Sequence, residues 1–382
     1  MVFSAVITAI LPTHYMDETF HVFQFFRTVE YLHSGKWEWD PAITTFPGLY
    51  FVSVPFFLGL SPFLPAISVL RGVNGILMNF ILLWSSDSIY TVMYPLNLFY
   101  SFLYYTDSGS TALVVLTSVL IRNRKKYFLS GLSALLAVAM RQTNIVWVFG
   151  FCLQECLDRY SVKSKSVRRS DLIELVKDFW IHILLGIGFI FFFIANNFSI
   201  VLGHHEHHSV SLHFAQVNYF VLTIVGAQGP SEWLSIARAS VTNPRWRRMG
   251  LLFVLSVIAS QIGTVAHPFI LSDNRHYSFY FYRYFISHRL IRSVLIPILV
   301  SVSLSQRPMG GWIFWMCTLL TTVPSPLIEF RYFNIPATFV LMKEGNKTST
   351  QFFFVLVNLI TMYVFLFHPF QWMDGSLARF MY

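Results

Sequence analysis

A pair of adjacent carboxylates, Asp17 and Glu18, lies near the start of the chain in the sequence Tyr15-Met16-Asp17-Glu18. A carboxylate can accept the proton of an attacking hydroxyl group, which is the task of a general base. The neighbouring carboxylate could orient a sugar or hold the base in place. The same dipeptide also fits an ordinary acidic loop at a membrane surface. By themselves, these two residues therefore indicate only a candidate for acid–base chemistry.

The second chemical pattern is a set of cations interleaved with aromatic residues in two short segments. Its members are Arg275, His276 and Arg283 in the first segment, and Arg331, next to Glu329, in the second. Guanidinium groups bind phosphate through paired hydrogen bonds. Aromatic belts and long arginine side chains are also ordinary features of membrane interfaces. The density of cations favours phosphate binding, with Glu329 as the orienting partner of Arg331.

Asp107 and Arg141 each lie where an apolar segment is interrupted. Ionisable groups near membrane depth usually face a polar cavity or an oppositely charged partner. The two residues are therefore either substrate ligands or a structural pair at the ends of helices. Both interpretations stay open at this point.

Sequence patterns for a metal ion or a nucleotide are weak. The histidines around Glu206 lack the His-Glu-x-x-His spacing that places two imidazoles on one helical face. A solvated loop at 204–213 is the simpler interpretation. The sequence also has no Asp-x-Asp clamp and no glycine-rich phosphate loop. We therefore expect no metal site, no cofactor and no nucleotide-linked donor.

These side chains must be positioned by a mostly apolar chain. Of its 382 residues, 55% are hydrophobic and only 12% are charged, whereas soluble proteins carry about 25% charged residues. The composition predicts an all-α polytopic membrane protein that forms a single domain over residues 1–382. The 27 Lys and Arg residues outnumber the 18 Asp and Glu residues. Such an excess is typical of cytosolic membrane loops, and we expect no nucleic-acid partner.

Apolar runs predict about 13 membrane segments, given that a spanning helix needs about 20 apolar residues. The first run, 2–11, is shorter than this, and we expect a truncated N-terminus. Region 12–66 is polar and then rich in proline, which predicts a first lumenal loop with interfacial helices. The later segments are expected near 67–86, 89–105, 109–121, 127–140, 143–157, 179–200, 214–228, 249–270, 291–305, 309–324, 327–342 and 351–368.

Clusters of basic residues predict the orientation of these segments. Cytosolic loops carry an excess of Lys and Arg, and the clusters lie at 122–126, 163–169, 245–248 and 343–347. With these on the cytosolic side, counting the segments places all the candidate residues on the opposite face. A single active site requires such an arrangement.

The motifs also occur in the order that is typical of a known family. The matching pieces are Tyr15–Glu18, Trp39–Tyr50, Leu103–Ser110, Arg141–Trp147, Asp273–Tyr280, Glu329–Phe333, Phe370–Trp372 and Arg379–Tyr382. Each piece is short, but the ordered set covers nearly the whole chain and is specific. The chain resembles the endoplasmic-reticulum α-1,2-glucosyltransferases that add the terminal glucose to the lipid-linked oligosaccharide of N-glycosylation. It departs from their pattern in its short first helix and in a short connection near 85–88.

The resemblance implies a GT-C-type glycosyltransferase in the endoplasmic-reticulum membrane, with its active site facing the lumen. The donor would be dolichyl phosphate glucose, and the acceptor the diglucosylated dolichyl-diphosphate oligosaccharide. Membrane lipid would surround both. Asp17 matches the position of the proposed base. From their charge and position, the residues that we expect to bind the substrates are Glu18, Asp107, Arg141, Arg275, His276, Arg283, Glu329 and Arg331.

Two other functions remain open. A related dolichyl-phosphate mannosyltransferase would share the base and the phosphate-binding cations but would differ in its sugar pocket. A transporter or channel modulator would show an inverted repeat and a polar path through the membrane, and neither is visible in the sequence.

Overall fold

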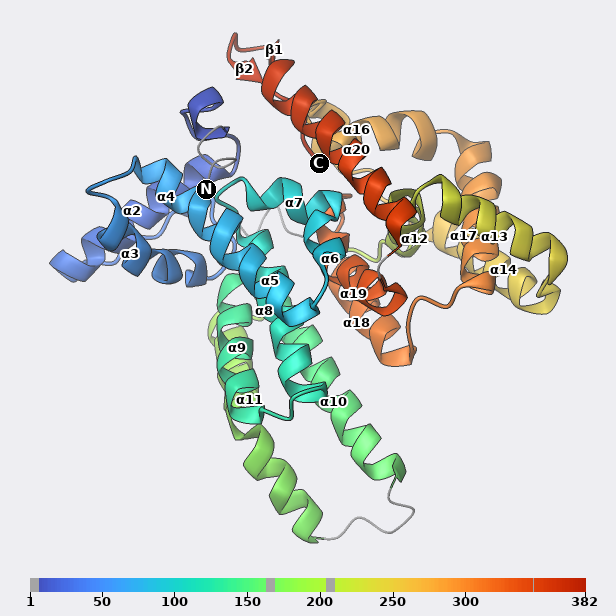
Figure 1. Ribbon diagram of the computed structural model, residues 1–382, viewed down its shortest axis with the longest axis horizontal. Coiled ribbons are helices and arrows are strands. Elements are labelled where there is room, and N and C mark those ends of the chain that lie inside the picture. The colour runs from blue at the N-terminus through green and yellow to red at the C-terminus, as the bar shows by residue number, and fades with distance from the viewer. Residues whose placement is uncertain (1–6, 163–168, 204–209, 346) are drawn as a thin grey trace. The chain divides into compact units, whose positions relative to one another are not determined.

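The computed structural model describes residues 7–162, 169–203, 210–345 and 347–382, and helices dominate this part of the chain (Figure 1). The predicted all-α class is confirmed. The chain divides into two compact units, Met1–Val92 with Tyr100–His207, and Met93–Phe99 with His208–Tyr382. The single domain over residues 1–382 stays a prediction.

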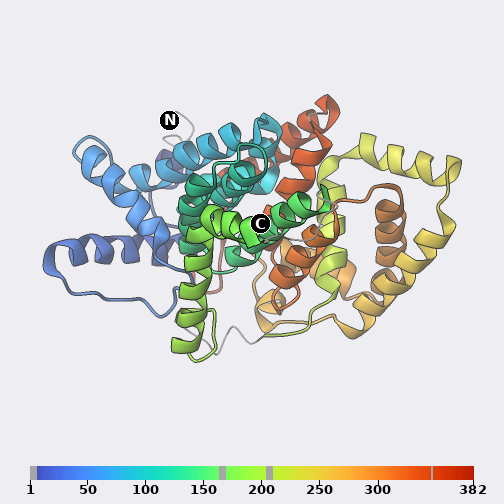
Figure 2. The same ribbon diagram turned by 90° about the horizontal axis from the view of Figure 1, so that it is seen from below.

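The first unit is built from the region around Asp17 and a helical bundle. Its helices are α2 (Glu18–Ser34), α3 (Gly48–Leu60), α4 (Ala66–Gly72), the π-helix η1 (Val73–Met78), α5 (Asn79–Ser86), α8 (Thr106–Arg122), α9 (Tyr127–Met140), α10 (Asn144–Val162) and α11 (Arg169–Ala195). Helices α8 to α11 pack side by side (Figures 1 and 2). At Gly48, a Cβ atom would lie 2.5 Å from the backbone of Ala139. Glycine therefore lets α3 approach α9 closely.

The second unit contains the two cationic segments. Its helices are α12 (Ala215–Gln228), α13 (Pro230–Thr242), α14 (Trp246–Ile262), α15 (Pro268–Ser272), α16 (Tyr277–Phe281), η3 (Tyr282–Ile286), η4 (Ile291–Leu295), α17 (Ile296–Gln306), α18 (Trp312–Thr322), η5 (Phe330–Phe333), α19 (Asn334–Glu344) and α20 (Thr348–Phe367). Helix α17 packs on α12, α13 and α14. Two short antiparallel strands, β1 (Phe370–Gln371) and β2 (Leu377–Ala378), follow α20.

Three helical stretches of the described residues are long and apolar enough to cross a membrane: Ala66–Ser86, Ser170–Ala195 and Thr348–Phe367. A bent pair, Tyr277–Ile286 with Ile291–Gln306, would make a fourth. Only 11% of the most apolar part of Ser170–Ala195 is buried inside the protein, so most of the surface of this apolar helix is available to contact lipid. The chain is therefore a multi-pass membrane protein.

Several other apolar helices are shorter than a bilayer requires. Trp312–Thr322 has 11 residues and Tyr127–Met140 has 14. At about 1.5 Å per residue, such helices are shorter than the roughly 30 Å hydrocarbon core. The count of about 13 membrane segments stays a prediction.

Several elements differ from the expected boundaries; helix α11, for example, begins at Arg169 and not near 179. Two further differences involve a proline or a glycine. The segment expected at 89–105 is divided into α6 (Ile89–Met93) and α7 (Pro95–Ser101), because proline starts a helix more readily than it continues one. Helix α13 was not predicted. It begins at Pro230 after Gly229, whose φ is 84°, a left-handed turn that breaks the helix before it.

Candidate active site

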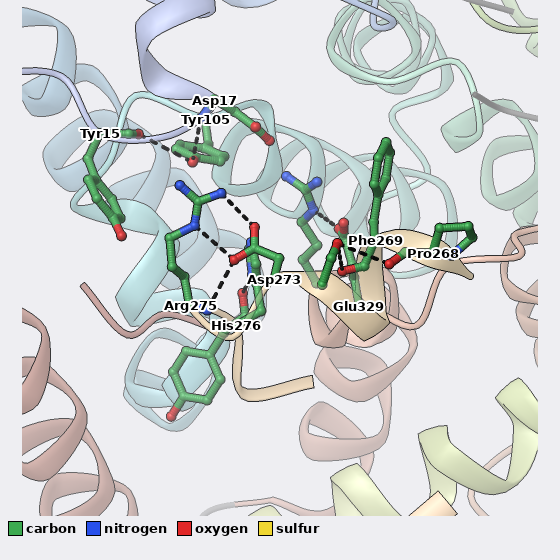
Figure 3. Close-up of polar contacts among 12 residues, drawn as sticks. Tyr15, Asp17, Tyr105, Pro268, Phe269, Asp273, Arg275, His276 and Glu329 are labelled. Carbon is green, nitrogen blue, oxygen red and sulfur yellow. Dashed lines mark hydrogen bonds and ion pairs between the residues drawn. The ribbon is translucent and has the colours of Figure 1, made fainter. Parts of the chain in front are cut away.

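Asp17 lies at the turn that leads into helix α2, which begins at Glu18. Its backbone N–H donates a hydrogen bond to the hydroxyl of Tyr105 at 3.1 Å (Figure 3). The half-buried Asp17 side chain makes no capping hydrogen bond to α2. Met16, the residue before it, has a φ of 54°, which is uncommon for a residue other than glycine. The sharp turn at Met16 and the hydrogen bond to Tyr105 therefore set the position of Asp17.

Glu18 points into the protein and forms an ion pair with Arg71 of helix α4. Arg71 Nε lies 2.8 Å from Oε1 and Nη2 lies 2.6 Å from Oε2 of this carboxylate. The side chains of both residues are completely buried. The backbone N–H groups of Tyr15 and Tyr104 also donate to the Glu18 carboxylate, at 3.1 and 2.9 Å. Both Glu18 oxygens are therefore occupied by donors of the protein itself.

The bend before α8 is held by a buried amide. Asn74 lies in the π-helix η1, and its Nδ2 donates to the carbonyl oxygens of Leu103 and Tyr105 at 2.8 and 2.7 Å. π-helical turns occur frequently at functional sites because they re-aim a side chain. Asn74 thus fixes the segment that carries the Tyr105 hydroxyl and the Tyr104 N–H.

Asp107 and Arg141 form an ion pair. This agrees with the interpretation of the sequence as a structural pair at the ends of two helices. Arg141 Nη1 lies 2.5 Å from Asp107 Oδ1. Asp107 is in the first turn of α8, where a negative charge is favoured by the helix dipole. Its side chain is 2% exposed, whereas that of Arg141 is 21% exposed. The pair joins the start of α8 to the end of α9 and leaves part of the guanidinium accessible.

Gln24 of helix α2 fastens the loop that follows the same helix. Its Nε2 donates to the carbonyl oxygen of Glu38 at 2.8 Å, and its Oε1 accepts from the N–H of Asp40 at 2.9 Å. Further along, Gln142 Nε2 donates to the carbonyl oxygen of Thr44 at 2.8 Å. The loop between α2 and α3 is thus connected to α2 and to the α9–α10 turn by side-chain hydrogen bonds.

In the second unit, Asp273 holds Arg275 in a fixed orientation. Arg275 Nε and Nη2 lie 2.8 and 2.7 Å from the two carboxylate oxygens (Figure 3). The guanidinium also lies over the ring of Trp372, 4.2 Å from its centre. Burial raises the pKa of Asp273, but hydrogen bonds from Arg275 and the electrostatic effect of the nearby His276 outweigh this and lower the pKa. Asp273 therefore stays ionised and keeps the guanidinium plane in place.

His276 is held by the last residues of the chain described. The backbone N–H of Tyr277 donates to the carbonyl oxygen of Met381 at 2.8 Å, and Met381 N–H donates to Arg275 O at 2.9 Å. His276 Nδ1 lies 3.1 Å from the carbonyl oxygen of Tyr382. The two segments thus pair side by side, which fixes the backbone under Arg275 and His276.

The other predicted cations differ in their surroundings. Arg331 in η5 pairs with Glu329, the orienting partner that the sequence predicted, and both side chains are mostly buried. Arg283 in η3 is exposed and lies 5.9 Å from the ring centres of Phe279 and Tyr284. Among the residues that the structure describes, no carboxylate pairs with Arg283. Arg283 is the most accessible of these arginines.

The solvated loop expected at 204–213 lies largely outside the described residues, because the structure resumes at 210. In the described part of the chain, no group of three or more His, Cys, Asp or Glu side chains is arranged to hold a metal ion.

Sequence reasoning did not single out Arg71, Asn74 or Tyr105. Arg71 carried a usable signal, because it is the one charged residue of the apolar stretch Ala66–Ser86. A charged residue in such a position is expensive and usually has a partner or a function. Asn74 and Tyr105 carried no comparable signal, since single polar and aromatic residues are common in membrane helices.

Comparisons with known proteins agree with the resemblance seen in the sequence. The profile of the DIE2/ALG10 family matches residues 11–343. The Arabidopsis thaliana protein named Dol-P-Glc:Glc(2)Man(9)GlcNAc(2)-PP-Dol alpha-1,2-glucosyltransferase is 31% identical and aligns over 99% of this chain and 97% of its own. Proteins of the same name from Mus musculus and Homo sapiens are 31% and 29% identical, over 100% of this chain and 96% of theirs. No solved structure matches the chain significantly. Both the family match and the full-length relatives show that this chain belongs to the DIE2/ALG10 family.

Proposed function

We propose that this chain is an inverting α-1,2-glucosyltransferase. It moves glucose from dolichyl phosphate glucose to the diglucosylated dolichyl-diphosphate oligosaccharide, the last step in assembly of the N-glycan precursor. The observation that carries the proposal is full-length similarity to relatives that bear this activity in their names. The basic clusters at 122–126 and 245–248 support an orientation with the site facing the lumen of the endoplasmic reticulum.

Asp17 is the general base in this proposal. The 2-hydroxyl oxygen of the acceptor glucose attacks the anomeric carbon of the donor, and Asp17 takes the hydroxyl proton. The bond from the anomeric carbon to the phosphate oxygen breaks, and dolichyl phosphate leaves with the electron pair. A single displacement inverts the β-linked donor and gives an α-linkage. The half-buried position of Asp17 in the turn before α2, with its backbone N–H held by the Tyr105 hydroxyl, supports this role.

Arg275, Arg331 and Arg283 are the proposed ligands of phosphate charge, with His276 as a weaker contributor. Asp273 and Glu329 hold the first two guanidinium groups in place. Preorganised cations stabilise charge as it develops on a leaving group, and they need no rearrangement during the reaction. No general acid is required, because a phosphate monoester is already a good leaving group.

The remaining carboxylates divide into two roles. Arg141 is partly accessible beside the buried Asp107, so we assign Arg141 to substrate binding and Asp107 to its orientation. Both oxygens of Glu18 accept hydrogen bonds from within the protein. This arrangement favours a positioning role for Glu18 over direct orientation of the acceptor sugar.

The proposal is tested in cells that lack their own enzyme for this step, by profiling dolichol-linked oligosaccharides by size. The wild-type chain should restore the triglucosylated species. Asp17→Asn, expressed at the same level, should leave the diglucosylated precursor. Glu30→Gln is the matched control, because Glu30 is an exposed carboxylate of the same helix α2, and it should behave as wild type.

Each outcome separates one part of the proposal. A wild-type chain that leaves the precursor unextended contradicts the glucosyltransferase function. An Asp17→Asn chain that restores the full glycan contradicts the base assignment alone. In membranes, faster transfer from dolichyl phosphate mannose than from dolichyl phosphate glucose would favour the mannosyltransferase alternative.

A further inference from the structure

We propose that Arg71 is a positioning residue that holds the Asp17 turn in its reactive geometry. The inference rests on the proposed function, because it gives Arg71 a role only through the base Asp17. Arg71 lies in helix α4, whereas Asp17 lies in the turn before α2. Arg71 is thus 54 residues beyond the base that it would position.

Arg71 binds backbone carbonyl oxygens as well as a carboxylate in the segment that carries Asp17. Besides its two bonds to Glu18, Arg71 Nη1 donates to the carbonyl oxygen of Leu11 at 2.7 Å. Arg71 Nη2 also donates to the carbonyl oxygen of Thr13 at 3.0 Å. One guanidinium therefore binds the chain on both sides of Asp17.

Glu18 extends this network to the segment before α8. Its carboxylate accepts from Tyr104 N–H, and the hydroxyl of the next residue, Tyr105, accepts from Asp17 N–H. Arg71, the Tyr104 backbone and the Tyr105 hydroxyl thus all bind the turn that carries Asp17 and Glu18. Asp17 directly precedes Glu18, and Glu18 belongs to a fully buried ion pair. A shift of that pair would therefore move the base.

The chemistry of the pair requires arginine in particular. A planar guanidinium can bind a carboxylate through two donors while its other N–H groups reach separate acceptors. A lysine ammonium carries the same charge at a single point. It could satisfy Glu18 but could not also span the Leu11 and Thr13 carbonyl oxygens.

A purely structural ion pair makes a different prediction. Buried ion pairs are often replaced by uncharged residues with little loss of stability. If Arg71 served only folding, its substitution would reduce the amount of folded enzyme but not the rate of each folded molecule. A positioning residue instead changes the turnover rate of molecules that are folded and bind their substrates.

The test uses Arg71→Lys in the purified full-length protein, in lipid nanodiscs, with dolichyl phosphate glucose and a lipid-linked acceptor. We expect kcat per folded molecule to fall about 10- to 100-fold, because small misplacements of reacting groups carry losses of this order. KM for donor and acceptor should change less than about threefold. Arg122→Gln is the matched control, since Arg122 is an exposed arginine at the end of α8, and it should keep wild-type kcat.

A double-variant experiment separates positioning from folding. In the Asp17→Asn background, Arg71→Lys should change the residual rate by less than about twofold, because the group it positions is already absent. An equal loss in both backgrounds would overturn the proposal, because Arg71 would then affect the rate independently of Asp17. Wild-type kcat in Arg71→Lys would overturn it as well.

A second variant keeps the test decisive if Arg71→Lys does not fold. Arg71→Gln combined with Glu18→Gln leaves no unpaired buried charge but removes the contacts to the Leu11 and Thr13 carbonyls. Its kcat should fall as for Arg71→Lys, and full activity would contradict the proposal. Failure of the proposed function is seen separately, because it requires an inactive wild type, and failure of the base assignment requires a fully active Asp17→Asn.

Discussion

The two units use arginine–carboxylate pairs in different ways. The Arg71–Glu18 pair of the first unit is completely buried and binds only groups of the protein. The Arg275–Asp273 pair of the second unit has side chains 25% and 20% exposed. One arginine fixes a backbone turn, while the other is held in place yet remains accessible to a ligand. The surroundings of an arginine therefore indicate its role better than its charge does.

The difference between the two ion pairs is tested most directly by removing the buried arginine. Arg71→Met leaves the Glu18 carboxylate buried without its partner, and we expect a loss of about 3–5 kcal/mol in the free energy of unfolding. Thermal unfolding in detergent, followed by intrinsic fluorescence, measures it. Adding Glu18→Leu should recover most of the loss, because two apolar side chains need no charge compensation. An Arg71→Met protein as stable as wild type would show that the ion pair does not stabilise this turn.

Removing the accessible arginine should have the opposite effect: a small change in stability and a large loss of activity. In Arg275→Gln we expect stability to change by less than about 1 kcal/mol, as is usual for partly exposed pairs. Glucose transfer should fall about 100-fold, because a preorganised charge at the phosphate is lost. Transfer assays and unfolding of the same preparation check both parts. Equal losses of stability in Arg275→Gln and Arg71→Met would remove the distinction between the two pairs.

A smaller change sharpens the account of the Asp17 turn. Tyr105→Phe removes only the hydroxyl that accepts from Asp17 N–H. We expect a loss of about 1 kcal/mol in stability and a severalfold fall in kcat, without a change in donor KM. Tyr363→Phe provides a control, because Tyr363 is an exposed tyrosine of α20. Unaltered kcat in Tyr105→Phe would show that the hydroxyl does not help to place the base.

The smallest effect is a pH dependence of the second pair. The pKa of Asp273 is lowered from 3.8, so the folded state binds its proton more weakly than the unfolded state does. Its contribution to stability is therefore complete above about pH 4 and is lost as the pH falls through the lowered pKa. The stability difference between wild type and Asp273→Asn, less than about 1 kcal/mol, should shrink as the pH is lowered below about 4. A difference that stays constant over this titration would show that hydrogen bonding without charge suffices.

The fold was predictable where the sequence is locally unambiguous. Helix α9 occupies Tyr127–Met140, as predicted, because Lys126 and Arg141 bracket an uninterrupted apolar run. Helix α13 was missed, since its run of mixed polar and apolar residues resembles a loop. The break at Pro95 was also missed, because proline is tolerated in many membrane helices.

The site was predictable as a set of motifs but not as a set of contacts. The positions of Asp17, Arg275 and Arg331 follow from ordered motifs, and the Glu329–Arg331 pair follows from its short spacing. The partner of Glu18 is 53 residues away, and only the packing of α4 against the turn before α2 brings Arg71 there. Contacts of this kind depend on tertiary structure, which local sequence patterns do not encode.

The π-helical turn η1 adds a constraint on chain length. It begins at Val73, two residues after Arg71, and contains Asn74. The directions of these two buried side chains are therefore related by a turn that is one residue wider than an α-helical one. Deleting Val73, which lies between them, would rotate Asn74 by about 100° relative to Arg71. Asn74 and Arg71 could then no longer reach their partners together. A deletion scan of Val73–Met78 would detect this requirement, whereas a substitution scan that changes only exposed side chains, such as Ile76, would pass over it.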